Sequence, residues 1–309
     1  MATTSTQRNH ELPGWFVVLA RCRGLAGPVG LVLMVAGVAL AALAPSELVP
    51  SLVRLGVPIS GAALVGAGMF VTVLPIDPAI RTATPRVLRP PVDGIWEGCN
   101  SPTDGVPSHG THGFGQTYAI DLVPRGEAEG TGETPTRPEA NFQRPETFPG
   151  FGRPIRSSCS GTVVAVHDRA RDHRARQGRL GAAVLVVEGM LREFAGGRAM
   201  LGNHVSVAVP DDTDPDRTVY VVFAHLQRGS LRVRVGEDVQ PGQVIGRCGN
   251  SGNSTEPHLH MQVMDHPRAL VAAGLRFVFD EFHVDGEPRH QGLPATGERM
   301  YVPPASEST

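Results

Sequence analysis

The sequence contains no lysine, so all 28 of its basic residues are arginines. A Gly-rich segment at residues 249–255 therefore lacks the lysine with which a phosphate-binding loop reaches its ligand, and we interpret it as a tight turn. The net charge is only −2, which leaves no basic excess for a polyanion. These absences argue against a phosphate loop and against nucleic acid as a partner.

Cysteine is also scarce. The chain has four cysteines, Cys22, Cys99, Cys159 and Cys248, and no two of them form a Cys-x-x-Cys pair. This number and spacing exclude a disulfide framework and give no thiolate metal site. A cysteine nucleophile, either Cys159 or Cys248 acting with a histidine, is an alternative. However, Cys248 falls in a Gly-rich turn without an activating motif.

Charged residues are absent from two long stretches near the start of the chain. Residues 25–44 form a run of 20 uncharged residues, and residues 56–76 form a run of 21. Each run has the length needed to cross the hydrocarbon core of a lipid bilayer. We therefore predict two transmembrane helices joined by a short linker, in a multi-pass protein of the cell membrane. A single cleaved signal peptide is the alternative, but it leaves the second run unexplained.

Arginines flank the predicted hairpin unevenly. Three arginines precede it within residues 1–24, and three follow it between residues 77 and 91, a Pro- and Arg-rich linker. Arg54 is the only arginine between the two runs. The positive-inside rule therefore favours the cytoplasm for both ends of the hairpin, and with them for the soluble region.

The region 92–288 has the pattern of a mostly β domain, because short apolar or alternating runs recur between glycines and prolines. We predict an antiparallel β-sheet core, sandwich or barrel-like, with insertions at residues 124–152 and 168–203, the second partly helical. Residues 289–309 lack periodicity and predict a disordered tail. The predicted strands are 117–123, 161–166, 182–187, 204–209, 219–224 and 259–263.

One predicted strand carries two histidines two residues apart. In Pro257-His258-Leu259-His260, strand alternation turns His258 and His260 to one face and Leu259 to the other. The two imidazoles are then roughly 6.5 to 7 Å apart, which suits one metal ligand beside one catalytic base. By itself, a His-x-His pair more often occupies half-exposed strand positions than a metal site, so the rest of the sequence must decide.

Asp121 lies in another apolar strand, where an unpaired carboxylate would be costly to bury. Two histidines, His109 and His112, precede it in a segment whose glycines permit a tight backbone. One of them, Asp121 and one histidine of the His-x-His pair would form a three-ligand zinc site. Its fourth position would stay open for water, as in catalytic zinc sites.

A further histidine, His225, ends the predicted strand 219–224 at the start of a Gly-containing turn. A single histidine in such a position most often has no catalytic role. Beside a metal site, however, it becomes a candidate base or oxyanion-stabilising group. The other histidines of the soluble region have no comparable setting and are expected at the surface or in packing positions: His167, His173, His204, His266, His283 and His290.

Several short motifs follow one another in order between residues 202 and 260. They are Gly-Asn-His-Val at 202–205, Phe-Ala-His-Leu at 223–226, Pro-Gly-Gln-Val-Ile-Gly at 241–246, Gly-Asn-Ser-Gly-Asn-Ser-Thr at 249–255 and Pro-His-Leu-His at 257–260. This series resembles the LytM and lysostaphin-type zinc peptidases, which cut peptide cross-links of bacterial cell walls. The resemblance covers roughly residues 92–288 and leaves out the predicted hairpin.

The resemblance implies a role for four residues. Asp121 and His260 correspond to metal ligands of the family. His258 and His225 correspond to the two histidines that do not bind the metal, of which His258 would accept the proton of water and His225 would stabilise the developing oxyanion.

The first histidine ligand departs from the usual motif of the family, which places it four residues before the aspartate. Here His109 precedes Asp121 by 12 residues and His112 precedes it by nine. Longer variants of the motif favour His109 as the ligand, and His112 stays open as the alternative.

The sequence thus predicts a membrane-anchored metalloendopeptidase with one Zn²⁺ ion, which hydrolyses peptide bonds in peptidoglycan cross-links with zinc-activated water. This substrate favours an extracytoplasmic peptidase domain, in conflict with the arginine pattern. The alternative is a non-catalytic module of the same fold that binds wall peptide or a partner hydrolase. Such modules normally lack metal ligands, whereas every ligand position can be filled in this chain.

Overall fold

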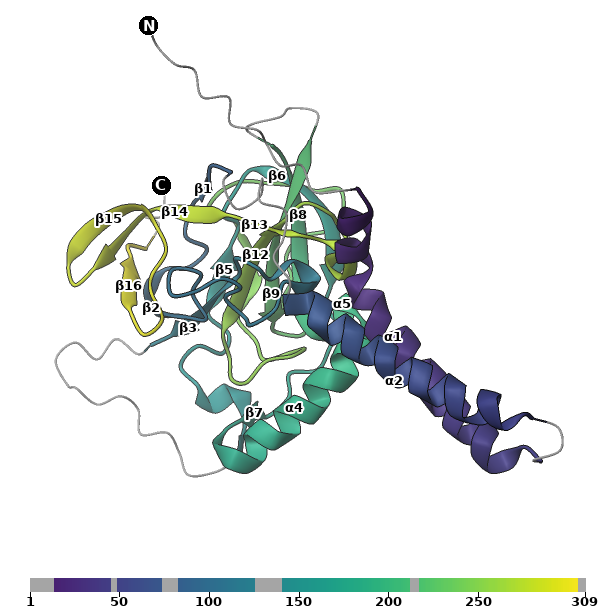
Figure 1. Cartoon of the computed structure of the whole chain (residues 1–309). Helices are drawn as coiled ribbons and strands as arrows, with labels where there is room; N and C mark the ends of the chain where they lie inside the picture. Colours follow the sequence, from purple (N-terminus) through teal and green to yellow (C-terminus); the bar gives the residue numbers. More distant parts are fainter. Residues whose placement is uncertain (1–13, 46–48, 74–82, 126–140, 212–216, 305–309) are drawn as a thin grey trace, which may run out of the picture.

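The computed structural model describes residues 14–45, 49–73, 83–125, 141–211 and 217–304. A hairpin of two long helices projects from a β-rich domain (Figure 1). The prediction of a mostly β domain after the hairpin is confirmed.

The domain is built on a large twelve-stranded sheet. Its strands are β1 (Arg86–Leu88), β2 (Gly94–Cys99), β3 (Ile120–Pro124), β6 (Gly161–His167), β8 (Asn203–Pro210), β9 (Thr218–Leu226), β10 (Asp238–Val239), β12 (Leu259–Met264), β13 (Gly274–Leu275), β14 (Phe277–Val284), β15 (Glu287–Gly292) and β16 (Arg299–Val302). The order is β1-β14-β16-β2-β3-β12-β9-β8-β6-β10, with β13 beside β12 and β15 beside β14. Strand β1 runs parallel to β14, while the central pairs around β12 are antiparallel.

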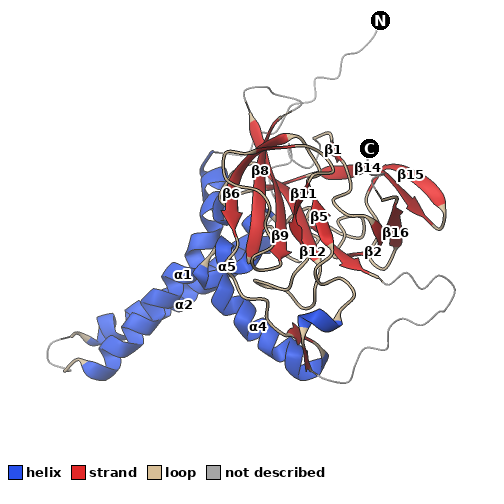
Figure 2. Ribbon diagram, turned by 180° about the vertical axis from the view of Figure 1, so that it is seen from behind, coloured by secondary structure: helices blue, strands red, loops and turns tan. Residues whose placement is uncertain are grey.

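Smaller elements cover this sheet. Two further strand pairs are β5 (Pro154–Arg156) with β11 (Val244–Arg247), and β4 (Phe142–Gln143) with β7 (Ala175–Arg176). The helices of the domain are α4 (Gly178–Ala195) and α5 (Gly197–Leu201), with the 3-10 turns η1 (Gly113–Gly115), η2 (Pro145–Thr147) and η3 (Ala269–Val271). Figure 2 shows that the helices gather on one side of the sheet.

The sheet separates two apolar clusters. On β12, Leu259 and Met261 face the main core, which β5 and β11 close from the other side. A smaller cluster on the opposite face contains Phe114 of η1 and Leu201 of α5. Because side chains alternate along a strand, His260 faces this second side, under the helices.

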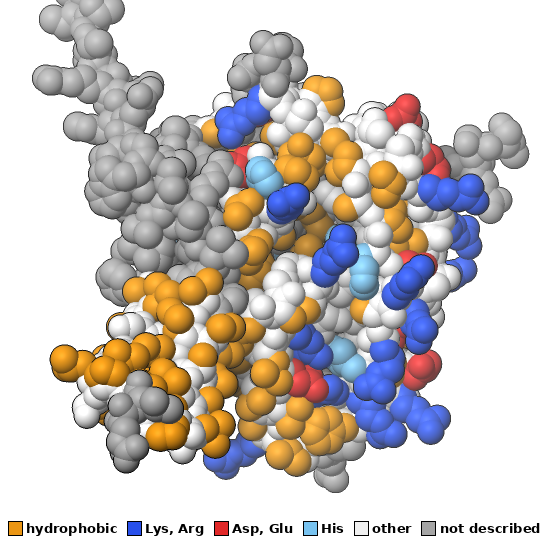
Figure 3. Space-filling model, turned by 90° about the vertical axis from the view of Figure 1, so that its right-hand side faces the viewer, with side chains coloured by type: hydrophobic (Ala, Val, Ile, Leu, Met, Phe, Trp, Pro, Cys, Tyr) orange, Lys and Arg blue, Asp and Glu red, His pale blue; other side chains and the backbone are white. Residues whose placement is uncertain are grey.

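The hairpin consists of α1 (Gly14–Leu43) and α2 (Ser51–Val73). Glycines allow close contact between the helices: a Cβ atom on Gly61 would lie 2.4 Å from the backbone nitrogen of Met34. Figure 3 shows that hydrophobic side chains cover the described outer surface of the hairpin. The exposed ones include Val32, Val35, Val38, Leu43, Leu52, Leu55 and Ile59.

Within the described residues, one stretch, Ser51–Gly68 of α2, is long and apolar enough to cross a membrane. The apolar part of α1, Val29–Leu43, is shorter. A two-helix transmembrane hairpin is therefore not confirmed. The helices begin at Gly14 and Ser51, earlier than the uncharged runs, which begin at residues 25 and 56. An uncharged run marks only the apolar part of a helix. Arginine interrupts such a run but is itself a good helix former, so the helices extend beyond the runs.

The strand predicted at residues 182–187 is wrong, since these residues lie within α4. A six-residue apolar run does not distinguish a strand from a helix. The helical part that we predicted for residues 168–203 is present as α4 and α5. The strand predicted at residues 117–123 begins three residues later, as β3.

The predicted disordered tail is also wrong for most of its length. Residues 287–292 and 299–302 form β15 and β16, and β16 joins the large sheet beside β2. Arg289 and Glu298 form an ion pair with N–O distances of 2.5 and 2.8 Å. Residues 305–309, and residues 77–82 of the predicted linker 77–91, lie outside the described residues. Residues 86–88 of this linker form β1, which pairs with β14 in the large sheet.

A pair of substitutions in β16 tests this correction. Met300 is fully buried, whereas the neighbouring Tyr301 is 44% exposed on the other face. Met300→Ala should lower the free energy of unfolding by about 2–5 kcal/mol, because it leaves a cavity in the core. Tyr301→Ala should lower it by less than about 1 kcal/mol. Equal effects in chemical denaturation of the two variants would show that β16 is not packed as described.

Candidate metal centre

Two neighbouring strands and one loop bring three polar side chains together. Asp121 on β3 lies directly opposite His260 on β12 in the antiparallel register. His109 reaches the pair from the loop before η1. One donor atom from each of the three lies within 4.8 Å of the others. The Asp121 carboxylate is 3.1 Å from Nε2 of His109 and 2.9 Å from Nδ1 of His260.

Two more histidines face the same space. Nε2 of His258 is 3.5 Å from the Asp121 carboxylate. The ring of His225 is centred 4.9 Å from that of His258 and 5.5 Å from that of His260. The structure thus brings together all five site residues that the sequence predicts.

His225 reaches this space through an unusual backbone conformation. Along β9, Val221 and Phe223 face the main core, so strand alternation alone would turn His225 the same way. His225 instead has a φ of 61°, in the left-handed region that non-glycine residues rarely adopt. This conformation rotates its side chain towards the other histidines, and strain of this kind is concentrated at functional sites.

The two histidines nearest Asp121 are each held by their far nitrogen. Ser108 donates its hydroxyl proton to the Ala119 carbonyl, so its oxygen accepts a hydrogen bond of 3.0 Å from Nδ1 of His109. Nε2 of His260 donates to Oε1 of Gln262 at 2.9 Å. In the neutral rings, these bonds place the proton on the far nitrogen and leave a free electron pair on the near nitrogens, Nε2 of His109 and Nδ1 of His260.

The other two histidines are held by backbone carbonyls from the Gly-rich turn and the residues after it. Nδ1 of His225 donates to the Ser251 carbonyl at 2.8 Å, and Nδ1 of His258 donates to the Glu256 carbonyl at 2.7 Å. In each ring Nε2 is therefore left to face the site. The segment interpreted as a tight turn, together with Glu256 directly after it, thus also orients two imidazoles.

Asp121 is ionised in these surroundings. Burial raises the pKa of its carboxyl, but the charges of His109 and His258 outweigh this effect and hold the pKa well below the usual range. Asn100 donates a further hydrogen bond of 2.7 Å to the same carboxylate. Burial and the neighbouring histidines lower the pKa of His225, whereas the charge of Asp121 overcomes burial and raises the pKa of His258.

The structure distinguishes the two upstream histidines. His109 lies in the cluster, while Nδ1 of His112 is paired with Oγ1 of Thr117 at 3.2 Å. It also weakens the alternative of a cysteine nucleophile. Burial raises the pKa of Cys159 to about 11 and raises that of Cys248 further, so neither thiol is activated.

The residues that hold the imidazoles and Asp121 by hydrogen bonds were not identified from the sequence. Gln262 could have been identified, because it follows His260 by two positions and lies on the same face of β12. Ser108 and Asn100 gave no comparable signal. The cluster lines a cavity of about 200 Å³, whose wall includes Leu185 of α4 and Leu201 of α5. The insertion at residues 168–203 therefore helps to enclose the site.

The donor set fits a zinc ion. Two imidazole nitrogens and one carboxylate oxygen converge, as in zinc sites that keep a fourth position for substrate or water. The hydrogen bonds of His109 and His260 on their far sides are those expected around metal-binding histidines.

Known proteins resemble part of this chain. Residues 147–271 match the model of Peptidase family M23. Endolysin 2638A of Staphylococcus phage 2638A is 47% identical over 45 residues, which cover 14% of this chain and 9% of the endolysin. The matched M23 segment includes His225, His258 and His260 but begins after His109 and Asp121.

Solved structures include the catalytic domain of lysostaphin from Staphylococcus simulans, with 18% identity, a TM-score of 0.28 and coverage of 63% of this chain and 90% of that domain. A zinc-containing peptidase from Vibrio cholerae has 18% identity and a TM-score of 0.28, with coverage of 62% and 37%. At these scores, the structural matches add nothing about activity. The match to Peptidase family M23 lies over the segment that carries three of the five clustered residues, and it confirms the resemblance of residues 147–271 to this peptidase family.

Proposed function

We propose that the chain is a zinc metalloendopeptidase that hydrolyses peptide bonds in peptidoglycan cross-links. The observation that carries the proposal is the convergence of His109, Asp121 and His260 within 4.8 Å, beside two further histidines. Membership of the matched segment in family M23 supports peptide-bond hydrolysis. In this proposal those three residues hold one Zn²⁺ ion, and His258 and His225 act on the substrate and water.

The histidines of the site have defined tasks in this mechanism. A zinc ion supplies a Lewis acid that polarises a carbonyl and makes water a better nucleophile at neutral pH. His258 accepts the proton of the attacking water at Nε2, because its Nδ1 proton is engaged with the Glu256 carbonyl. The bond to Ser251 orients His225, and when both of its nitrogens are protonated it donates from Nε2 to the oxyanion.

His258, directly before β12, and His260, on β12, have different roles in this proposal, and substitution separates them. His260→Ala should lose the metal, whereas His258→Ala should keep it and lose most of its turnover. Metal content can be measured by atomic emission on the purified chain, together with hydrolysis of cross-linked wall peptides. Equal zinc content in wild type and His260→Ala would refute the ligand assignment. Normal zinc content without hydrolysis by wild type would favour the non-catalytic binding module.

Gln262 offers a second test, because it fixes the tautomer of His260. Gln262→Leu removes the acceptor and should weaken zinc affinity by about 10–100-fold in competition with a chelator. Gln262→Glu retains an acceptor oxygen and serves as the matched control, with affinity close to that of wild type. If both variants lose affinity equally, the hydrogen bond to His260 is not the cause.

We also propose that the hairpin anchors the chain in the cell membrane with the peptidase domain outside the cytoplasm. The apolar stretch Ser51–Gly68 and the location of the substrate support this, while the flanking arginines oppose it. The chain should remain with membranes after alkaline washing, and added protease should degrade the domain in intact cells. Protection in intact cells with digestion in inverted vesicles would exclude peptidoglycan as the substrate and leave the metal site untouched.

A further inference from the structure

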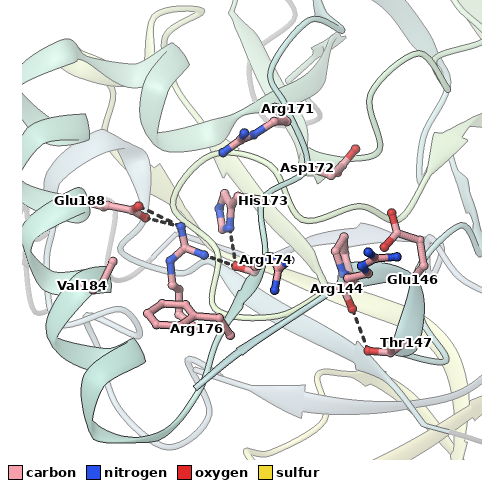
Figure 4. A pocket seen from close by; sticks show the side chains of 12 residues that line it. Arg144, Glu146, Thr147, Arg171, Asp172, His173, Arg174, Arg176, Val184 and Glu188 are labelled. Atoms are coloured by element: carbon pink, nitrogen blue, oxygen red, sulfur yellow. Dashed lines mark hydrogen bonds and ion pairs between the residues drawn. The ribbon is translucent and has the colours of Figure 1, made fainter. Parts of the chain in front are cut away.

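A second cavity, of about 810 Å³, lies beside the metal centre. Its walls come from three separate segments: β4 with η2, residues 171–176, and one face of α4 (Figure 4). Four arginines line it, namely Arg144, Arg171, Arg174 and Arg176, and we call it the arginine pocket.

One arginine of the pocket is already paired. Nη2 of Arg176 donates to both carboxylate oxygens of Glu188, at 2.8 and 3.0 Å, and its guanidinium lies 5.6 Å from the ring centre of Phe142. The other three differ: within the described part of the chain, the guanidinium groups of Arg144, Arg171 and Arg174 have no hydrogen bond or ion pair. They remain available for a ligand.

The acidic side chains of the pocket do not balance these three charges. Glu188 is shared between Arg176 and Arg192. The carboxylate of Asp172 accepts backbone N–H groups of Asn250 and Arg228, at 2.8 and 2.9 Å. Asp172 keeps its negative charge, so Asp172 and Glu146 together oppose the three unpaired guanidinium groups and leave one excess positive charge in the pocket.

The arginine pocket and the metal cavity share a wall. Helix α4 presents Val184 to the pocket and the next residue, Leu185, to the metal cavity. The backbone N–H of Arg176 donates to the carbonyl of Thr255 at 2.6 Å, and Thr255 lines the metal cavity. One helix and one loop therefore separate the two spaces.

We propose that the arginine pocket binds a carboxylate of the peptide substrate, so that the enzyme selects cross-linked peptides with free carboxylates over their amidated forms. This inference rests on the proposed function. Guanidinium groups bind carboxylates with paired, charge-assisted hydrogen bonds, which amides cannot replace. The apolar side chains of Phe142 and Val184 suit the aliphatic part of a peptide better than a bare inorganic anion.

Binding to the zinc-loaded full chain tests the pocket without relying on turnover. The probes are a cross-linked peptide dimer with free carboxylates and the same dimer amidated, titrated by calorimetry into the His258→Ala protein. The free acid should bind about tenfold more tightly or better, the usual effect of a hydrogen bond to a charged group. Adding Arg171→Gln and Arg174→Gln should abolish this preference, whereas Arg234→Gln, on another exposed segment, should retain it.

Several results would overturn the proposal. The first is equal affinity of the His258→Ala protein for the two dimers. The second is a preference for the free acid that survives the double arginine substitution. The third is arginine-dependent binding of inorganic phosphate without any preference between the dimers. Hydrolysis by the wild-type chain separates this proposal from the proposed function. Equal cleavage of both dimers would leave the peptidase standing and reject the pocket. An arginine-dependent binding preference without any hydrolysis would support the pocket and reject the peptidase.

Discussion

The buried carboxylate of Asp121 in the middle of the sheet is the group on which the arrangement of the site depends. An ionised carboxylate in such a place is stable only if opposite charges or hydrogen-bond donors surround it. Polar groups reach it from three directions. Asn100 after β2 donates a hydrogen bond to the carboxylate. The near nitrogens of His109, from the loop before η1, and of His260, on the next strand, lie 3.1 and 2.9 Å from it. The strand order β2-β3-β12 therefore determines both the stability of this charge and the composition of the site.

Hydrogen bonds on the far side of each imidazole determine which ring nitrogen faces the site. A side-chain oxygen of Ser108 or Gln262 engages each of the two histidines bonded to Asp121, while backbone carbonyls of Ser251 and Glu256 engage the other two. Each imidazole thus presents one chosen nitrogen to the centre. In our proposal the first two histidines bind the metal and the other two are catalytic.

Strand alternation explains how much of the site was predictable. It places His258 and His260 on one face. The pairing of β3 with β12, which brings Asp121 opposite His260, is a long-range contact that spacing does not give. The orientation of His225 could not be predicted, because it depends on a left-handed backbone at the end of β9. The arginine pocket could not be identified either. Its residues come from three separate segments, and no periodic pattern in the sequence connects them.

The errors in the predicted fold arise from long-range contacts. The run at 182–187 is as apolar as a strand, but it continues into an 18-residue helix that covers the metal cavity. The C-terminal residues have weak local preferences and become ordered by pairing with β2, some 200 residues earlier in the chain. Such pairings stabilise a strand through cross-strand neighbours that are distant in sequence.

The central claim, that His109, Asp121 and His260 bind zinc, is tested most directly by X-ray absorption spectroscopy of the zinc-loaded full chain. The account predicts a first shell of nitrogen and oxygen atoms only, at about 2.0–2.2 Å, with the signal of two imidazoles. That signal should fall to one imidazole in the His109→Ala chain. A sulfur ligand, or a spectrum unchanged by His109→Ala, would contradict the claim.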